Sequence, residues 1–308
     1  MVVVDSFFQQ GFKHEVCEDY ALHGDLTIPY AIVCDGCSNG NGPSINSDFG
    51  SRILAKAAEE HILRPTEALL NGVADTAKTQ IRSFILDNNA LCSTLMIVRK
   101  YDNDSKQVIT VGDGFVCARK KTGEWVIKDI DFLPGGTDNH PAPFYLKYKM
   151  FGEIQNYKNQ FGGMCRISTF TGDLLNPELD LPSEIPKPNV REMLFMEKLH
   201  YEEEKFEVSD DLYHCEFSFP DEEYDLVCVF TDGPNAVSKL VKTPRQKFIQ
   251  HLHSLDVIRK LVSFVRFKNG FLNHHRNWLF KQNKTGTILK EEWITGDDIS
   301  AGVIYTGE

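Results

Sequence analysis

The sequence has little basic charge and no long apolar run. Its 33 Lys and Arg residues are outnumbered by 44 Asp and Glu residues, so the formal net charge is -11. An acidic surface repels phosphate backbones, and a primary role in binding nucleic acid is therefore not expected. No apolar stretch approaches the ~20 residues of a membrane-spanning helix, and the N-terminus lacks the basic and apolar regions of a signal peptide. We expect a cytoplasmic protein that does not bind a membrane.

The chain also lacks a second closely spaced cysteine pair to accompany Cys34 and Cys37. A structural zinc site needs such a pair, and a thioredoxin-like dithiol needs a helix directly after the motif, where the sequence has SNGNGP. The nearby glycines do not have the G-x-G-x-x-G spacing of a dinucleotide loop. Val33 stands where a haloacid-dehalogenase phosphatase would need Asp. We expect eight reduced cysteines, mostly buried, with Cys37 a bystander rather than a nucleophile.

The hydrophobic pattern predicts strands separated by one pair of helices. The first helix is expected from Asp48 to Leu63 with Ser47 as its N-cap, and a second helix capped by Thr66 packs antiparallel to it. Their expected apolar faces are Phe49, Ile53, Ala57 and Ala58, and Leu69, Leu70, Val73, Ala77, Ile81 and Phe84. Strands are expected at 2–8, 19–26, 29–35, 90–102, 106–120, 124–130, 164–170, 224–230 and 299–306, and a helix at 244–280. Because strands, helices and strands alternate in this way, we expect a layered α+β domain.

Acidic residues recur at the ends of these expected strands. An apolar strand followed by Asp-Gly occurs three times, at Asp35, Asp113 and Asp232. Two further acidic pairs, Glu18–Asp19 and Asp297–Asp298, directly precede strands. One Asp-Gly after a strand is most often a turn, but five acidic sites at the strand ends of one domain indicate a cluster. Since converging carboxylates repel one another and hard divalent cations offset that repulsion, the sequence predicts a Mg²⁺ or Mn²⁺ site.

The order of these motifs, ED, DG, a helix pair, ST, GDG, TDG and GDDIS, resembles the metal-dependent PP2C (PPM) protein serine/threonine phosphatases. The resemblance covers residues 1–308 as a single domain, with a divergent segment at about 134–220. It implies a four-layer αββα sandwich, in which helix pairs flank two antiparallel sheets. It also implies a binuclear Mn²⁺ or Mg²⁺ centre, with a weaker third ion, that activates a water for attack on phosphorus.

The resemblance assigns roles to individual residues. Asp35 matches the carboxylate that bridges both ions, and Gly36 matches a backbone-carbonyl ligand. Asp232 and Asp297 match ligands of the second ion, and Asp113 matches the third site. Glu18 and Asp19 match the ED pair that holds metal-bound waters or contacts a metal, and Ser93 and Thr94 match a structural ST pair.

The sequence departs from the family pattern around the substrate phosphate. Where the family usually has an Arg that clamps the phosphate, this chain has His14, preceded by Lys13. Neither residue reproduces the bidentate guanidinium fork. Cys37 replaces a His that many members carry as a candidate general acid, and Asp298 stands where Asn is usual.

We expect a metal-dependent phosphatase that acts on phosphoserine and phosphothreonine in proteins, with Asp35, Asp232, His14 and Lys13 as its catalytic residues. Two alternatives stay open at this point. One is a catalytically weak or inactive pseudophosphatase that serves as a binding module, which the loss of the Arg favours. The other is an enzyme of the same fold that acts on a small phosphorylated molecule.

Overall fold

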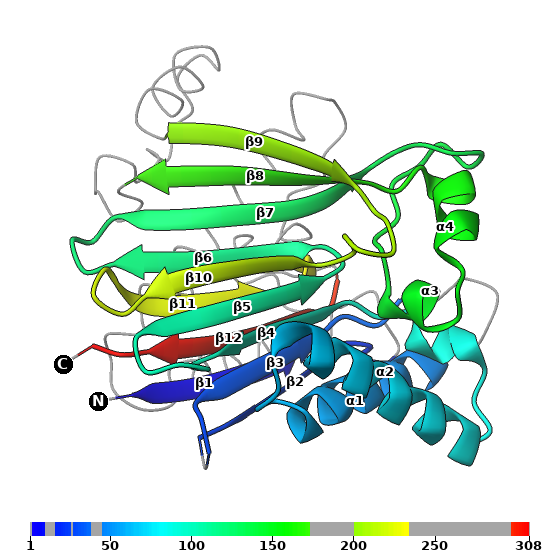
Figure 1. The fold of residues 1–308 in the computed structure, drawn as a ribbon, viewed down its shortest axis with the longest axis horizontal. Helices are drawn as coiled ribbons and strands as arrows, with labels where there is room; N and C mark the ends of the chain where they lie inside the picture. The colour runs from blue at the N-terminus through cyan, green and yellow to red at the C-terminus, as the bar shows by residue number, and fades with distance from the viewer. Residues whose placement is uncertain are drawn as a thin grey trace, which may run out of the picture.

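The computed structural model describes residues 2–9, 16–25, 27–37, 45–172, 200–233 and 297–307. Within these residues the chain forms two antiparallel β-sheets that pack against each other (Figure 1). The seven-stranded sheet has the order β1 (Val3–Gln9), β12 (Ile299–Tyr305), β11 (Tyr224–Phe230), β6 (Gly114–Lys120), β7 (Trp125–Leu133), β8 (Met164–Gly172) and β9 (His200–Glu207). The five-stranded sheet has the order β10 (Cys215–Pro220), β5 (Ser105–Val111), β4 (Leu95–Arg99), β3 (Tyr30–Cys34) and β2 (Tyr20–Gly24).

A helix pair covers the five-stranded sheet, as the pattern predicted. α1 (Ile45–Glu60) contacts β2, β3 and β4, and it packs on α2 (Thr66–Ser83). The predicted caps are wrong: the backbone of Ser47 lies inside α1, and Thr66 is the first helical residue of α2, where no side chain caps the helix. Two residues of the predicted apolar faces, Phe49 and Phe84, are instead exposed, by 45% and 62%.

The remaining residues of the predicted helix faces are buried in one continuous hydrophobic core with both sheets. All five residues of β3 are buried, because one face of this strand meets α1 and the other meets β12. Gly302 of β12 permits that close approach, since a Cβ at this position would lie 2.7 Å from the Cβ of Ala31. A continuous apolar run is therefore what a strand between two layers requires.

One predicted strand, at 106–120, is two strands in the structure. β5 belongs to the five-stranded sheet and β6 to the seven-stranded sheet, and the chain crosses between the sheets at Asp113. Gly112 and Gly114 make the crossing possible with φ values of +102° and +136°, which other residues rarely adopt. A Cβ at Gly114 would also lie 2.5 Å from the carbonyl oxygen of Phe230.

The other predicted strands are present, with shifted ends. Residues 90–91 fall in the 3₁₀ helix η1 (Asn88–Leu91) rather than in a strand. The divergent segment contains two helices that the pattern did not predict, α3 (Leu146–Met150) and α4 (Ile154–Phe161), and the strands β9 and β10. The predicted helix at 244–280 lies outside the described residues. No helix among the described residues is long and apolar enough to cross a membrane.

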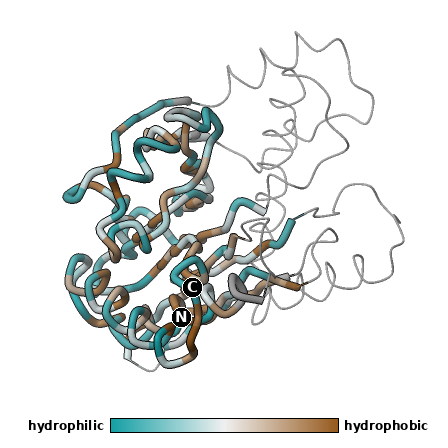
Figure 2. The backbone as a smooth tube through the Cα atoms, turned by 90° about the vertical axis from the view of Figure 1, so that its right-hand side faces the viewer, coloured by the Kyte–Doolittle hydropathy of each residue, from teal (hydrophilic) through white to brown (hydrophobic). Residues whose placement is uncertain are grey.

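The two ends of the chain lie side by side. β1 pairs with β12 in antiparallel register, from Val3 opposite Tyr305 to Gln9 opposite Ile299. The N- and C-terminal ends lie close together in two perpendicular views (Figures 1 and 2). The seven-stranded sheet thus combines the first and the last strands that the structure describes.

Candidate metal centre

The strand registers gather the acidic motifs at one end of the sandwich. Tyr20, the first residue of β2, pairs with Cys34, the last residue of β3, so Asp19 and Asp35 are neighbours. In the other sheet, the last residue of β11 lies beside the second residue of β6 and the third residue of β12. The acidic residues that follow β11 and precede β6 and β12 therefore meet at this same end, near α3 (Figure 1).

Asp19 is wholly buried and is held by a threonine from the other sheet. The Thr231 hydroxyl donates to Asp19 Oδ2 at 2.8 Å, and it accepts a hydrogen bond from the Ser300 backbone N–H at 2.9 Å. Burial raises the pKa of Asp19 well above its usual range, and the nearby Asp298 adds to the rise. The other oxygen, Asp19 Oδ1, has no hydrogen-bond partner among the described residues. Asp19 is thus a buried carboxylate whose charge is incompletely compensated.

The backbone of Asp35 is fixed by Thr94, which begins the chain segment leading into β4. The Asp35 N–H donates to Thr94 Oγ1 at 3.1 Å, and the Thr94 N–H donates to the Asp35 carbonyl oxygen at 2.9 Å. The next residue, the buried Gly36, pairs with Ser93 in an isolated β-bridge. The position of Asp35 therefore does not depend on its own side chain, which is half-buried and faces the other carboxylates.

The Asp35 carboxyl is the one that interacts with most of the others. Burial raises its pKa well above the usual range, and Asp19, Asp232 and Asp113 each raise it further. The carboxyls of Asp19 and Asp35 lie close enough to share a hydrogen bond when one of them is protonated. Four acidic side chains thus repel one another across the two sheets.

Asp113 and Asp232 form the second half of the cluster. Burial and then Asp232 raise the pKa of Asp113, and within the described part of the chain Asp113 Oδ1 has no hydrogen-bond partner. Asp232 is half-buried and is followed by Gly233. A Cβ at Gly233 would lie 2.1 Å from the carbonyl oxygen of Asp298, so only glycine allows the chain after β11 to pass this close to the start of β12.

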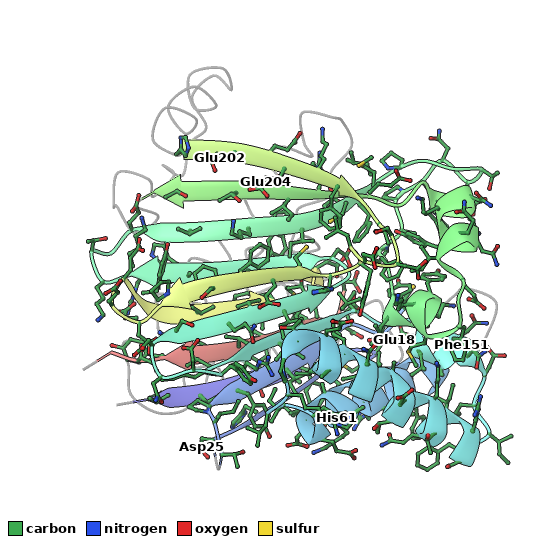
Figure 3. All side chains as sticks on the ribbon, viewed as in Figure 1. Glu18, Asp25, His61, Phe151, Glu202 and Glu204 are labelled. Atoms are coloured by element: carbon green, nitrogen blue, oxygen red, sulfur yellow. The ribbon has the colours of Figure 1, made fainter. Side chains whose placement is uncertain are left out.

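The two acidic pairs that precede strands are joined to each other. The Glu18 N–H donates to Asp298 Oδ2 at 2.5 Å, and the Ser51 hydroxyl of α1 donates to the Glu18 carbonyl oxygen at 2.6 Å. The Asp298 N–H donates in turn to Asp297 Oδ1 at 3.0 Å. Glu18 lies at the end of the sandwich that also carries α3 (Figure 3). The side-chain oxygen of an Asn could accept the same hydrogen bond from the Glu18 N–H, so we assign Asp298 a structural role. Asp297 is half-buried and is the more available metal ligand of the two.

The structure adds one acidic residue that the sequence reasoning missed. Asp129, on β7, is half-buried, and burial raises its pKa to about 7, with further contributions from Asp131 and Asp232. Asp131 forms an ion pair with Arg166, while Asp129 also adds to the raised pKa of Asp113. The signal was present in the sequence as two acidic residues within the apolar strand WVIKDIDFL.

Cys37 and Tyr145 border the cluster. The Cys37 N–H donates to the Cys92 carbonyl oxygen at 2.8 Å, and burial raises the pKa of the Cys37 thiol. A protonated thiol is a poor nucleophile, which agrees with the expectation that Cys37 is a bystander. The buried Tyr145 hydroxyl lies near the Cys37 thiol and near Asp35 and Asp113, and burial raises its pKa. The sequence gave no signal for Tyr145, which lies just before α3.

The donor chemistry of the cluster fits a hard divalent cation. Carboxylates are the preferred ligands of Mg²⁺ and Mn²⁺, and Asp19 and Asp113 each present a buried oxygen that no described residue hydrogen-bonds. Within the described part of the chain, however, no three His, Cys, Asp or Glu groups are placed so that they could hold one ion together. Coordination by three of these groups would therefore require their side chains to move closer. The two predicted phosphate-binding residues, Lys13 and His14, lie outside the described residues.

Comparison with known proteins gives a distant likeness in structure alone. No family model and no curated protein matches this sequence. Among solved structures, the serine/threonine phosphatase Stp1 from Staphylococcus aureus is 12% identical, with a TM-score of 0.49, over 100% of this chain and 96% of that one. The PPM Ser-Thr phosphatase MsPP from Mycobacterium smegmatis is 12% identical, with a TM-score of 0.38, over 99% and 98%. PppA, a regulatory component of T6SS in Pseudomonas aeruginosa, is 15% identical, with a TM-score of 0.37, over 99% and 98%.

These values are too low to support a statement about activity. The α+β fold is instead defined by the strand order and the registers, which give two antiparallel sheets with a helix pair on the five-stranded sheet. The acidic cluster is likewise defined by its own contacts and its own electrostatics.

Proposed function

We propose that this protein is a metal-dependent phosphatase that hydrolyses phosphoserine and phosphothreonine esters in proteins. The observation that supports the proposal is the meeting of Asp19, Asp35, Asp113 and Asp232 at one end of the sandwich, where burial and mutual repulsion raise the pKa values of Asp19, Asp35 and Asp113. Such an arrangement is unfavourable by itself and becomes favourable when divalent cations bind. The resemblance of the sequence motifs to the PP2C phosphatases points to the same chemistry.

The proposed roles follow the family resemblance and agree with the contacts of the described side chains. Bound Mg²⁺ or Mn²⁺, as two ions and a weaker third, would supply a water of lowered pKa and would neutralise charge on the phosphoryl oxygens. Asp35 lies between the carboxylates of both sheets and is suited to bridge two ions, while Asp232 and Asp297 complete the set from the seven-stranded sheet. Thr231 and Thr94 keep Asp19 and Asp35 in place, since their hydrogen bonds cross between separate chain segments.

Three further parts of the proposal concern location, partners and the substrate phosphate. A cytoplasmic location agrees with eight free cysteines, of which six are buried. The net charge of -11 agrees with a protein that binds neither nucleic acid nor a membrane surface. Lys13 and His14 are proposed to contact the substrate phosphate on the basis of their place in the motif.

Hydrolysis of para-nitrophenyl phosphate and of a phosphothreonine peptide tests the proposal, with Mn²⁺, with Mg²⁺ and with EDTA. Wild-type protein should require a metal ion, Asp35→Asn should lose the activity, and Asp104→Asn, which changes an exposed carboxylate far from the cluster, should retain it. Higher turnover of the peptide than of the small ester would support protein substrates, and the reverse would favour a small phosphorylated molecule. A folded protein without turnover under any of these conditions would contradict the proposal.

A second candidate, the binding module without turnover, is favoured by one observation: no three ligand groups of the described chain converge on one point. Calorimetric titration with Mn²⁺ distinguishes the two. Metal binding without hydrolysis would support the binding module, whereas metal binding with hydrolysis supports the enzyme.

A further inference from the structure

An arginine of α1 lies over the start of β2, next to the acidic cluster. The Arg52 side chain is exposed, and its guanidinium carbon lies 5.0 Å from the centroid of the Tyr20 ring. Tyr20 directly follows Asp19, and in the strand register it pairs with Cys34, the residue before Asp35. The guanidinium group thus lies at the end of the five-stranded sheet that also carries the carboxyl groups of Asp19 and Asp35.

The segment of α1 around Arg52 is fixed by two contacts. The hydroxyl of Ser51, which is wholly buried, donates to the Glu18 carbonyl oxygen at 2.6 Å. In addition, a Cβ at Gly50 would lie 1.5 Å from the Ala90 carbonyl oxygen, so the helix packs closely against η1. Since consecutive Cα atoms are about 3.8 Å apart, the Arg52 backbone lies within one residue of the contact with Glu18. The exposed Arg52 side chain therefore extends from a fixed backbone beside the cluster.

The Tyr20 ring positions the guanidinium group. It packs in turn against the Phe8 ring of β1, with 5.2 Å between the two ring centroids. A cation over the face of an aromatic ring is attracted by the negative charge of that face. The planar guanidinium carries five N–H donors in a fork, and two of them match two oxygens of a phosphate group. A guanidinium that is placed by an aromatic ring is therefore suited to bind a phosphate.

Several other cations of the described chain have roles in the fold. The guanidinium groups of Arg99, Arg119 and Arg166 bind backbone carbonyl oxygens or carboxylates. Lys56, one turn after Arg52, is exposed and forms an ion pair within α1 at 2.7 Å. Because Lys56 carries the same charge on the same helix, it offers a matched control for Arg52.

We propose that the Arg52 guanidinium binds the phosphate group of the substrate through two hydrogen bonds to its oxygens. The inference rests on the proposed phosphatase function, since a phosphate is expected at this acidic end only when divalent cations are bound there. Carboxylates repel a phosphate dianion, and a guanidinium at their edge offsets part of that repulsion. Neither the ammonium of Lys13 nor the imidazole of His14 has the planar fork that fixes a phosphate in one orientation. Arg52 therefore sets both the affinity for the phosphate and its orientation.

Calorimetric titration with inorganic phosphate in the presence of Mg²⁺ tests the proposal without any turnover. Arg52→Ala should bind phosphate at least about tenfold more weakly than the wild type, because it loses two charge-assisted hydrogen bonds. Arg52→Lys, which keeps the charge but not the fork, should be weakened at least about threefold. Lys56→Ala, which removes the same charge one turn away, should bind phosphate like the wild type. Both alanine variants should fold, because each places the best helix former at an exposed helical position.

Free guanidinium ion separates a binding role of Arg52 from a purely structural one. At about 20 mM, far below the molar concentrations that unfold proteins, guanidinium chloride should restore part of the phosphate affinity of Arg52→Ala. The same concentration of sodium chloride should not restore it, and neither salt should strengthen phosphate binding by Lys56→Ala. In an active preparation, the KM of Arg52→Ala for para-nitrophenyl phosphate should rise by the same factor as its phosphate dissociation constant.

The possible outcomes separate this inference from the proposed function. The inference is wrong if Arg52→Ala binds phosphate as tightly as the wild type, if Lys56→Ala loses as much affinity, if guanidinium restores none, or if the wild type binds no phosphate in Mg²⁺. Turnover by a protein whose phosphate affinity does not depend on Arg52 would contradict the inference alone. Phosphate binding that depends on Arg52 in a protein without turnover would contradict the proposed enzyme and support the inference.

Discussion

Replacement of Asp35 by Asn should have opposite effects on stability with and without metal ions. The substitution removes one negative charge from a group of carboxylates and keeps the size of the side chain. It leaves the hydrogen bonds of residue 35 to Thr94 intact, because both are made by the Asp35 backbone. Without metal ions the variant should therefore be more stable than the wild type.

The magnitude follows from the interactions of Asp35. Two unit charges about 4 Å apart interact by ~4 kcal/mol at an effective dielectric constant of ~20. Asp35 is half-buried and can take up a proton, so we expect a gain of roughly 1–3 kcal/mol at pH 8. Because the folded protein raises the pKa of Asp35, the stability of the wild type is fully present below the unfolded pKa of about 4 and falls as the pH rises. The difference between variant and wild type should thus be small at pH 4 and larger at pH 8.

Saturating Mn²⁺ should reverse the order. A ligand at 100 times its dissociation constant stabilises the folded state by about 2.7 kcal/mol. The wild type should gain this stability, whereas Asp35→Asn should gain little. Urea unfolding at pH 4 and at pH 8, in EDTA and in Mn²⁺, measures the free energy of unfolding under all four conditions. Asp104→Asn is the control that should follow the wild type. A variant that is less stable than the wild type at pH 8 in EDTA would falsify the reasoning.

Three further predictions concern neighbouring positions. Gly233→Ala should lower the free energy of unfolding by roughly 1–3 kcal/mol, since the new methyl group would overlap the Asp298 carbonyl oxygen; urea unfolding measures the loss. Asp298→Asn should keep Mn²⁺ affinity in calorimetric titration, while Asp297→Asn should weaken it; equal losses would refute the distinction. Asp129→Asn should stabilise the metal-free protein by roughly 1–2 kcal/mol at pH 8 and by little at pH 4, because the raised pKa of about 7 removes wild-type stability between these pH values. Urea unfolding with EDTA at each pH checks this prediction, which an equal effect at both would contradict.

Much of the fold could be predicted from the sequence, because local patterns and tertiary packing agree in most elements. The apolar runs of β3 and β11 each identify a strand buried on both faces; Asp35 follows β3 directly, and Asp232 follows β11 after one residue. The crossing at Asp113 could not be predicted, since the apolar pattern continues through it and only the positive φ values of its two glycines reveal it. The segment 134–220 gave few signals because α3 is short and its buried side chains include Lys147.

The candidate site was predictable in its membership but not in all its details. Acidic residues at strand ends are visible in the sequence, and the antiparallel registers then bring them together. The sequence could not show that Asp298, rather than Asp297, accepts the Glu18 N–H, since that bond depends on how two distant segments meet. Asp129 was missed because a carboxylate inside a strand is ordinarily a solvent-facing residue.

The position of β12 has a consequence for how the molecule is made. This strand lies between β1 and β11, so the strand that pairs with β1 is separated from it in sequence by all the other strands of both sheets. During synthesis β1 has no hydrogen-bonded partner strand until β12 leaves the ribosome, and its unpaired edge must be protected from other chains for that time. Contacts of such high sequence separation also slow folding. Since β12 is preceded by Asp297 and Asp298, the acidic cluster can be completed only when the sheet closes, and metal affinity should appear as a late event in folding.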